Sequence, residues 1–233
     1  MAIGDKAHNI AQLRTLARRR LPRAIWEFME RGTEDDLLIA RNVSALQSLH
    51  LTPRALRDVS ARSAETVLFG RRQPLPLVIA PTGIADLMWH RGERAIASAA
   101  AAAGIPFTQT TSSTTSFAEI AKVAAAGHWM QMYLWERRDL SWQVVDAARE
   151  HGADVLVLTV DTPVWPLREF NRRAGMSNPV RPNGRLIGDF LRRPRWLAAV
   201  MGHYLLEGGL PQFANYPAEV GGRITGKVAR VAN

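Results

Sequence analysis

Three polar residues stand at or near the ends of apolar runs, where their side chains could bind a ligand. Thr110, Gln131 and Thr159 each carry a hydroxyl or an amide in such a position. These groups donate and accept hydrogen bonds, so three of them gathered at one place could hold the polar edge of a ligand. Taken singly, each could equally be a buried polar residue whose hydrogen bonds are satisfied within the fold.

Two further features could contribute to such a site. Arg168 carries a guanidinium, a planar fork of donors that matches the two oxygens of a carboxylate. Its alternative role is a surface salt bridge with Glu169 or another acid. The tripeptide Pro81-Thr82-Gly83 follows another apolar run, and a glycine there lets the backbone approach a ligand closely. An ordinary strand-to-loop turn is the alternative for this tripeptide.

The elements that must position these residues repeat along the chain. Apolar runs that predict strands begin at residues 76, 107, 129 and 155, and helical patterns lie between them at 92–103, from Ser116 onward and at 139–150. Ser116 can cap its helix while Glu119 completes a capping box. Strands this apolar on both faces are typical of a parallel sheet covered by helices. The pattern predicts an α/β fold, either an open doubly wound sheet or a (β/α)₈ barrel, and periodicity alone does not separate the two.

The flanking regions differ from this central repeat. Residues 8–48 have a helical pattern with a break near Leu21-Pro22. After Asp161 the alternation stops, and the remainder holds seven prolines with one helical pattern, at 196–206. We therefore expect a long loop region there, of the kind that is either functional or disordered.

Composition and charge limit the possible functions. The 233 residues are 47% hydrophobic and contain no cysteine, which predicts a globular protein without disulfides, thiolate metal sites or cysteine nucleophiles; we expect no metal. The net charge is +9, and from Asn171 onward ten Lys and Arg stand against three Asp and Glu, a balance of +7. Such a concentration attracts anionic lipid or nucleic acid, although a solvated basic tail is an equal alternative.

The basic region favours a membrane surface among these partners. The apolar pattern at 196–206 follows Arg192, Arg193 and Arg195, so residues 181–206 are suited to lie on an anionic membrane. No recognition motif for nucleic acid accompanies the charge, and no run reaches the roughly 18 apolar residues of a spanning helix. We expect a cytoplasmic protein, peripheral on the inner membrane surface.

Many short motifs, in order from about residue 10 to 175, resemble the FMN-dependent 2-hydroxy-acid dehydrogenases and oxidases. This family includes glycolate oxidase, flavin-type L-lactate dehydrogenase and mandelate dehydrogenase, and the chain looks closest to the mandelate and L-lactate dehydrogenase branch. The matching pieces include Gly32-Thr-Glu-Asp35, Arg57-Asp-Val-Ser60, Ala80-Pro-Thr-Gly83, Gly92-Glu93, Gln131-Met-Tyr133, Leu158-Thr-Val-Asp-Thr-Pro163 and Arg168-Glu169. The resemblance implies a (β/α)₈ barrel with FMN at the C-terminal mouth of the strands, of which this chain holds about the first four βα units.

The resemblance also implies residue roles. Pro81, Thr82 and Gly83 would lie along the flavin ring, and Thr110, Gln131 and Thr159 would contact its edge. Substrate, a small L-2-hydroxy acid, would be bound by Phe28, Tyr133 and Arg168. Phe28 stands where the family has a tyrosine, which removes a donor to the substrate carboxylate. His90 replaces a proline that is usual in the family.

Other parts of the family site have no counterpart here. The family uses a histidine general base in a Ser-Asn-His-Gly-Gly-Arg motif, a lysine beside the flavin and an arginine that anchors the carboxylate. None of the six histidines stands in such a motif, and a barrel usually builds its phosphate site from its last two strands. We therefore expect no catalytic residue, weak or absent FMN binding and no turnover from this chain alone.

The resemblance sets the expected organisation. Residues 1–74 form an N-terminal helical segment and barrel lead-in, 75–161 the first four barrel strands with their helices, and 162–233 a long basic loop region with a divergent tail. Two alternatives to a flavoenzyme remain: a non-catalytic fragment or half-barrel that pairs with a partner chain or with itself, and a basic module that binds membrane surfaces.

Overall fold

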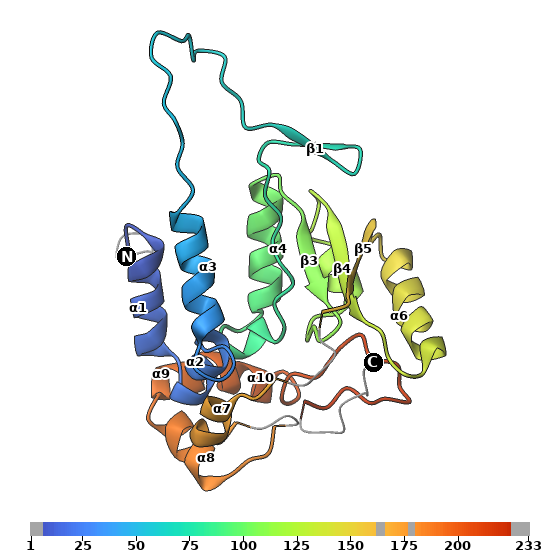
Figure 1. Cartoon of the computed structure of the whole chain (residues 1–233). Coiled ribbons are helices and arrows are strands. Elements are labelled where there is room, and N and C mark those ends of the chain that lie inside the picture. Colours follow the sequence, from blue (N-terminus) through green and yellow to red (C-terminus); the bar gives the residue numbers. More distant parts are fainter. Residues whose placement is uncertain (1–6, 162–165, 177–179, 225–233) are drawn as a thin grey trace.

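The computed structural model describes residues 7–161, 166–176 and 180–224 (Figure 1). The central element is a three-stranded parallel sheet with strand order β3-β4-β5. Its strands are β3 (Phe107–Thr110), β4 (His128–Tyr133) and β5 (Val155–Thr159). The register places Thr110 opposite Gln131 and Tyr133 opposite Thr159, so the carboxyl ends of the strands lie together.

The helices between these strands confirm the predicted alternation. They are α4 (Gly92–Ala102), α5 (Phe117–Ala121) and α6 (Arg138–Glu150). The Ser116 hydroxyl accepts a hydrogen bond from the Glu119 N–H, and the Glu119 carboxylate accepts one from the Ser116 N–H, so the predicted capping box is present. One apolar cluster joins α6 to β4 through Met130, Met132 and Val144. A parallel sheet with its connecting helices is therefore established; in the described residues it does not close into a barrel.

The predicted first strand is reduced to a single pairing. Ile79 forms a parallel bridge with Phe107, and its N–H donates to the Pro106 carbonyl at 2.9 Å. Prolines at 74, 76 and 81 remove backbone donors around it, which prevents a longer ladder. The segment nevertheless lies beside β3 in parallel, where the alternation predicts it.

The N-terminal region contains more than the predicted helices. Helices α1 (Ile10–Arg20), α2 (Arg23–Glu30) and α3 (Leu37–Gln47) confirm the helical pattern and its break near Leu21. The sequence analysis missed the antiparallel hairpin of β1 (Thr66–Leu68) and β2 (Arg71–Gln73). Both residues of its loop, Phe69 and Gly70, have positive φ, the requirement of a tight hairpin turn. Figure 1 shows the long irregular connection between α3 and β1 extending away from the rest of the molecule.

The expectation of a long loop after Asp161 is wrong for most of the described part. That part contains α7 (Glu169–Ala174), α8 (Gly184–Leu191), α9 (Pro194–Trp196), the π-helical turn η3 (Leu197–Gly202) and α10 (His203–Leu206). These short helices are stabilised by packing, because Trp196, Val200 and Met201 are buried against Leu21 and Ile25 of the N-terminal region. Figure 1 shows α2, α7, α8, α9 and α10 grouped at one end of the molecule.

Candidate functional site

A chain of side-chain hydrogen bonds runs across the carboxyl ends of the three strands. The Thr110 hydroxyl donates to Gln131 Oε1 at 2.9 Å, and Gln131 Nε2 donates to the Thr159 hydroxyl at 2.7 Å. Gln131 Oε1 also accepts the Thr111 N–H at 3.3 Å. Thr110 and Gln131 are buried, and Thr159 is half-buried. The structure therefore brings together the three strand-end residues that the sequence analysis selected.

The segment Pro81-Thr82-Gly83 lies next to this chain of hydrogen bonds. A Cβ atom added to Gly83 would lie 3.8 Å from Cβ of Ser112 and 3.9 Å from Cγ2 of Thr110. Pro81 and Thr82 are exposed, so their backbone is accessible. The absent side chain of Gly83 leaves room beside the end of β3, where a flat ligand could approach the backbone.

Two buried carboxylates support the turn that follows β3. Asp86 accepts hydrogen bonds from the Glu93 N–H at 3.0 Å and the Thr114 hydroxyl at 2.6 Å. Glu93 accepts hydrogen bonds from the Ser113 hydroxyl and the Thr115 N–H. Burial, with a smaller effect from Asp86, raises the pKa of Glu93 to about 7. These contacts fix the turn that carries Ser112.

A residue that the sequence analysis missed, Tyr216, reaches the same place from the C-terminal segment. Its hydroxyl lies 3.3 Å from the Ser112 hydroxyl, and its ring packs against Phe213 and Trp135. Burial raises the pKa of the Tyr216 phenol, and the nearby Tyr133 adds to that rise. The Tyr133 N–H donates to the Thr111 hydroxyl at 3.3 Å, so Tyr133 and Tyr216 both contact the turn that follows β3.

The other two predicted substrate residues also contact each other. The Arg168 guanidinium carbon lies 5.7 Å from the centre of the Phe28 ring. The buried Nε of Arg168 has no hydrogen-bond partner in the described residues. Glu169 pairs with Arg173 at 3.3 Å instead, so the alternative of an Arg168–Glu169 salt bridge is not what the structure contains. Within the described ranges, no hydrogen bond, salt bridge or ring contact links this pair to the strand-end group.

His90, which differs from the usual family residue, attaches the C-terminal helices to the sheet domain. Its Nε2 lies 3.0 Å from a Glu207 carboxylate oxygen, and its ring stacks on His203 with the centres 4.8 Å apart. Arg91 adds a second contact to Glu207 at 3.1 Å. Together these contacts hold α10 against the turn before α4.

Comparison with known proteins decides the family. The model of the family described as FMN-dependent dehydrogenase matches residues 17–228. The chain belongs to the FMN-dependent dehydrogenase family. (S)-mandelate dehydrogenase of Pseudomonas putida is 33% identical over 208 residues, which are 89% of this chain and 51% of that protein. L-lactate dehydrogenase of Caulobacter sp. (strain K31) is 38% identical over 78% of this chain and 48% of that protein.

Solved structures of the family agree with the fold. A crystal structure of the monotopic membrane protein (S)-mandelate dehydrogenase matches with a TM-score of 0.81 and 32% identity, over 92% of this chain and 56% of that chain. Mandelate oxidase with 3,3-difluoro-2-hydroxy-3-phenylpropionic acid matches with a TM-score of 0.68 and 31% identity, over 80% of this chain and 58% of that chain. The chain spans about half the length of the relatives that it matches.

The groups at the strand ends fit the polar edge of the family cofactor, FMN. Within the described residues, the second N–H of Gln131 Nε2 and the hydroxyl hydrogen of Thr159 make no hydrogen bond. Both are donors, and a flavin ring carries acceptor oxygens and nitrogens on its edge. Gly83 has no side chain to cover the neighbouring Thr110 and Ser112, so its backbone can approach a ligand at the same place. The donor set and the bare backbone of Gly83 are thus consistent with the family cofactor.

Proposed function

We propose that this chain supplies part of the flavin pocket and part of the substrate pocket of an FMN-dependent 2-hydroxy-acid dehydrogenase, built on the first four βα units of a (β/α)₈ barrel. The observation that carries the proposal is the hydrogen-bonded series Thr110–Gln131–Thr159 at the ends of three parallel strands. Ligands of barrel enzymes bind at this face because the ends of all strands converge there.

The flavin-binding residues have distinct tasks. Gln131 and Thr159 donate hydrogen bonds to the ring edge, and Thr110 orients Gln131 by donating to its Oε1 at 2.9 Å. Pro81, Thr82 and Gly83 run along one side of the ring with their backbone. FMN held by these residues would supply the acceptor for the hydride that leaves the substrate carbon.

The substrate-binding residues act on a carboxylate and a hydroxyl. Arg168 has a buried Nε without a partner in the described residues, and its guanidinium is the group that would pair with a substrate carboxylate. Phe28 contacts this guanidinium through its ring and supplies no hydroxyl. Tyr133 hydrogen-bonds the substrate near its reacting carbon. L-lactate and mandelate are the substrates of the relatives, and this chain takes a small L-2-hydroxy acid of that kind.

Residues 1–233 by themselves do not turn substrate over under this proposal. The histidines inside the described ranges include buried His128, which hydrogen-bonds Gln109 at 2.8 Å, and His90, which contacts Glu207. All six histidines lie within the described ranges, and none has a hydrogen bond or ring contact to Thr110, Gln131 or Thr159, so none is placed to accept the substrate proton there. Without a base, the hydride and proton cannot leave together.

Two measurements test the proposal. Purified chain mixed with FMN should show perturbed flavin absorbance, and added (S)-mandelate or L-lactate should leave that flavin oxidised. Flavin reduction by either acid would contradict the assignment of this chain as an incomplete site. An unperturbed flavin spectrum at millimolar FMN would contradict the flavin pocket itself.

A second candidate function is a non-catalytic half-barrel that pairs with another chain or with itself. The supporting observation is on β5, an edge of the described sheet, where Leu156 is 47% and Leu158 is 44% exposed. An exposed apolar strand at a sheet edge favours association. Leu158→Lys should shift the chain toward monomer in sedimentation velocity, whereas Leu38→Lys, also at an exposed leucine but on α3, should not. A monomer at all concentrations before substitution would remove this candidate.

The basic C-terminal helices give the chain a membrane-binding surface in this proposal, peripheral on the cytoplasmic side. In the described residues, no helix has the length and apolar character that crossing a bilayer requires. Leu191, Leu205 and Leu206 are exposed on α8 and α10, and Arg192 directly follows Leu191 in the sequence. The mandelate dehydrogenase relative is itself a monotopic membrane protein. Sedimentation with anionic vesicles that weakens at high salt would support this surface, and indifference to anionic lipid would remove it.

A further inference from the structure

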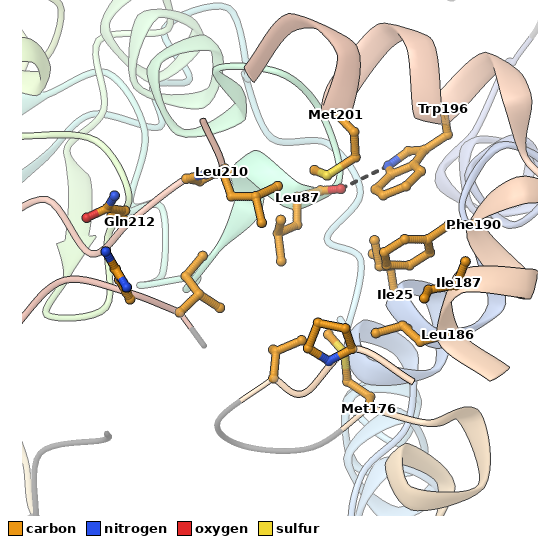
Figure 2. Close-up of a pocket in the computed structure, with 15 residues that line it drawn as sticks. Ile25, Leu87, Met176, Leu186, Ile187, Phe190, Trp196, Met201, Leu210 and Gln212 are labelled. Carbon is orange, nitrogen blue, oxygen red and sulfur yellow. Dashed lines mark hydrogen bonds between the residues drawn. The ribbon is translucent and has the colours of Figure 1, made fainter. Parts of the chain in front are cut away.

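A cavity of about 400 Å³ lies among the C-terminal helices, separate from the strand ends. Ile25 of α2 and Leu186 and Phe190 of α8 line it, together with Trp196 and Met201 (Figure 2). None of the residues assigned to flavin or substrate is among its lining residues. Pockets for small molecules typically measure about 300–1,000 Å³, so this volume is sufficient for a ligand.

The cavity has an apolar end and a polar end. Figure 2 shows Phe190 and Trp196 on one side and Gln212 on the opposite side. Gln212 pairs with Arg223 in an antiparallel bridge, and these two are the lining residues with an amide or a charge. The Trp196 indole N–H already donates to the Leu87 carbonyl at 2.9 Å and so leaves no free polar group at the apolar end. In the described part of the chain, Arg223 forms no salt bridge.

The cavity also reaches the protein surface. Ile187 and Leu210 both line it, and their side chains are 51% and 54% exposed. Leu191, one helical turn beyond Ile187, is 64% exposed and does not line the cavity. The opening is therefore bordered by apolar side chains.

These features select the chemistry of the occupant. A polypeptide segment would bring backbone N–H and C=O groups against walls that offer them no partner, at a high desolvation cost. A hydrocarbon chain has no such groups and gains from burial. The guanidinium of Arg223 at the polar end matches a carboxylate. We propose that this cavity binds one long-chain carboxylate, a fatty acid, with its chain beside Phe190 and Trp196 and its head group at Arg223.

Calorimetric titration of the FMN-free chain with dodecanoate, below the concentration at which it forms micelles, tests this site. We expect saturable binding of one dodecanoate per chain. Extending the acid by two methylenes from octanoate to decanoate should strengthen binding by about fifteenfold. Binding without saturation, or no binding, would overturn the proposal.

Two matched pairs of variants locate the site. Ile187→Trp fills the opening and should abolish binding, whereas Leu46→Trp adds the same ring at an exposed leucine of α3 outside the cavity and should not change it. Arg223→Gln should weaken dodecanoate binding by about tenfold and leave dodecanol binding unchanged, whereas Arg149→Gln, at an exposed position of α6 outside the cavity, should affect neither. Circular dichroism of each variant checks that it is folded.

The outcomes separate the possible explanations. Dodecanoate binding that survives Ile187→Trp would place it on the outer apolar surface and overturn the cavity site. Equal affinity for dodecanol and dodecanoate, unaffected by Arg223→Gln, would overturn the assignment of the head group. Since no flavin is present in these titrations, neither result bears on the proposed flavin pocket.

Discussion

The side-chain amide of Gln131 donates a hydrogen bond to the Thr159 hydroxyl at 2.7 Å and so connects β4 to β5 at their carboxyl ends. The same amide accepts hydrogen bonds from Thr110 and Thr111 on the other side. One buried glutamine thus fixes the relative positions of three strand ends. If FMN binds at these ends, its ring edge meets groups whose orientations are already set.

Replacing Gln131 should destabilise the fold measurably. Gln131→Leu leaves the Thr110 hydroxyl and the Thr111 N–H without their acceptor, and we expect the free energy of unfolding to fall by about 1–3 kcal/mol. Gln143→Leu, at an exposed position of α6, is the control and should change it by less than about 0.5 kcal/mol. Urea unfolding measures both. Equal effects of the two substitutions would contradict the role of Gln131 in joining the strands.

Riboflavin and FMN should bind this chain with similar affinity. In the proposed pocket the groups that fit a flavin would contact its ring, and a barrel normally supplies the phosphate site from its last two strands. Titration in about 0.5 M salt screens the general attraction between the basic chain and the phosphate. FMN binding more than about tenfold tighter than riboflavin binding, a difference of about 1.4 kcal/mol, would reveal a phosphate site within this chain.

Arg168 should recognise the carboxylate of a 2-hydroxy acid. Arg168→Met keeps the length of the side chain and removes its charge, so binding of mandelate, followed by NMR line broadening, should weaken while binding of mandelamide should not change. Arg173→Met is the control, since Arg173 pairs with Glu169 on the exposed face of α7. Loss of mandelate and mandelamide binding together would assign Arg168 a purely structural role.

The hydrogen bond between Tyr216 and Ser112 should hold the C-terminal segment against the strand ends. Tyr216→Phe removes it, and we expect a loss of about 0.5–1.5 kcal/mol in the free energy of unfolding. Because Ser112→Ala removes the same bond, the double variant should lose less than the sum of the two single losses. Strictly additive losses in urea unfolding would show that the two hydroxyls are not coupled.

Glu93 should make the stability depend on pH. Burial raises its pKa from 4.5 to about 7 in the folded protein. The unfolded chain releases this proton first, so the contribution of Glu93 to stability is complete below pH 4.5 and is lost as the pH rises through about 7. Glu93→Gln removes this dependence. Between those two pH values, the free energy of unfolding of the native chain should therefore fall by up to about 3 kcal/mol more than that of the variant. Glu150→Gln, exposed at the end of α6, should follow the native profile; identical profiles for Glu93→Gln would contradict the raised pKa.

The central alternation could be predicted from the sequence because each strand and helix carries its own local pattern. The apolar runs at 107, 129 and 155 and the Ser116–Glu119 capping box correspond to β3, β4, β5 and α5. The strand-end residues could be selected for the same reason, since polar residues directly follow apolar runs. The flavin and substrate roles came from the resemblance and remain proposals.

Most of the structure that the sequence did not predict depends on contacts between segments that are distant in the chain. Helices α7 and α8 are too short to give a strong helical pattern in the sequence. Helix α8 is held instead by long-range contacts such as the hydrogen bond from the Ala24 N–H to the Asp189 carboxylate, which no local pattern predicts. Tyr216 reaches Ser112 because the Ala214 N–H donates to the Ser113 carbonyl and Asn215 binds Phe117 and Thr115. The only local signal in this segment is its composition, since Phe213, Asn215 and Tyr216 lie close together in the sequence. The β1–β2 hairpin had a local signal in Phe69-Gly70 that the sequence analysis overlooked.

The most direct test of the flavin pocket is to follow the side-chain amide of Gln131 by ¹H–¹⁵N NMR while FMN is added, with Gln131→Leu identifying the signal. The account predicts that this signal and the backbone amides of Gly83 and Thr159 shift together along one saturation curve. FMN-induced shifts confined to other parts of the chain, with the Gln131 amide unmoved at saturation, would contradict it.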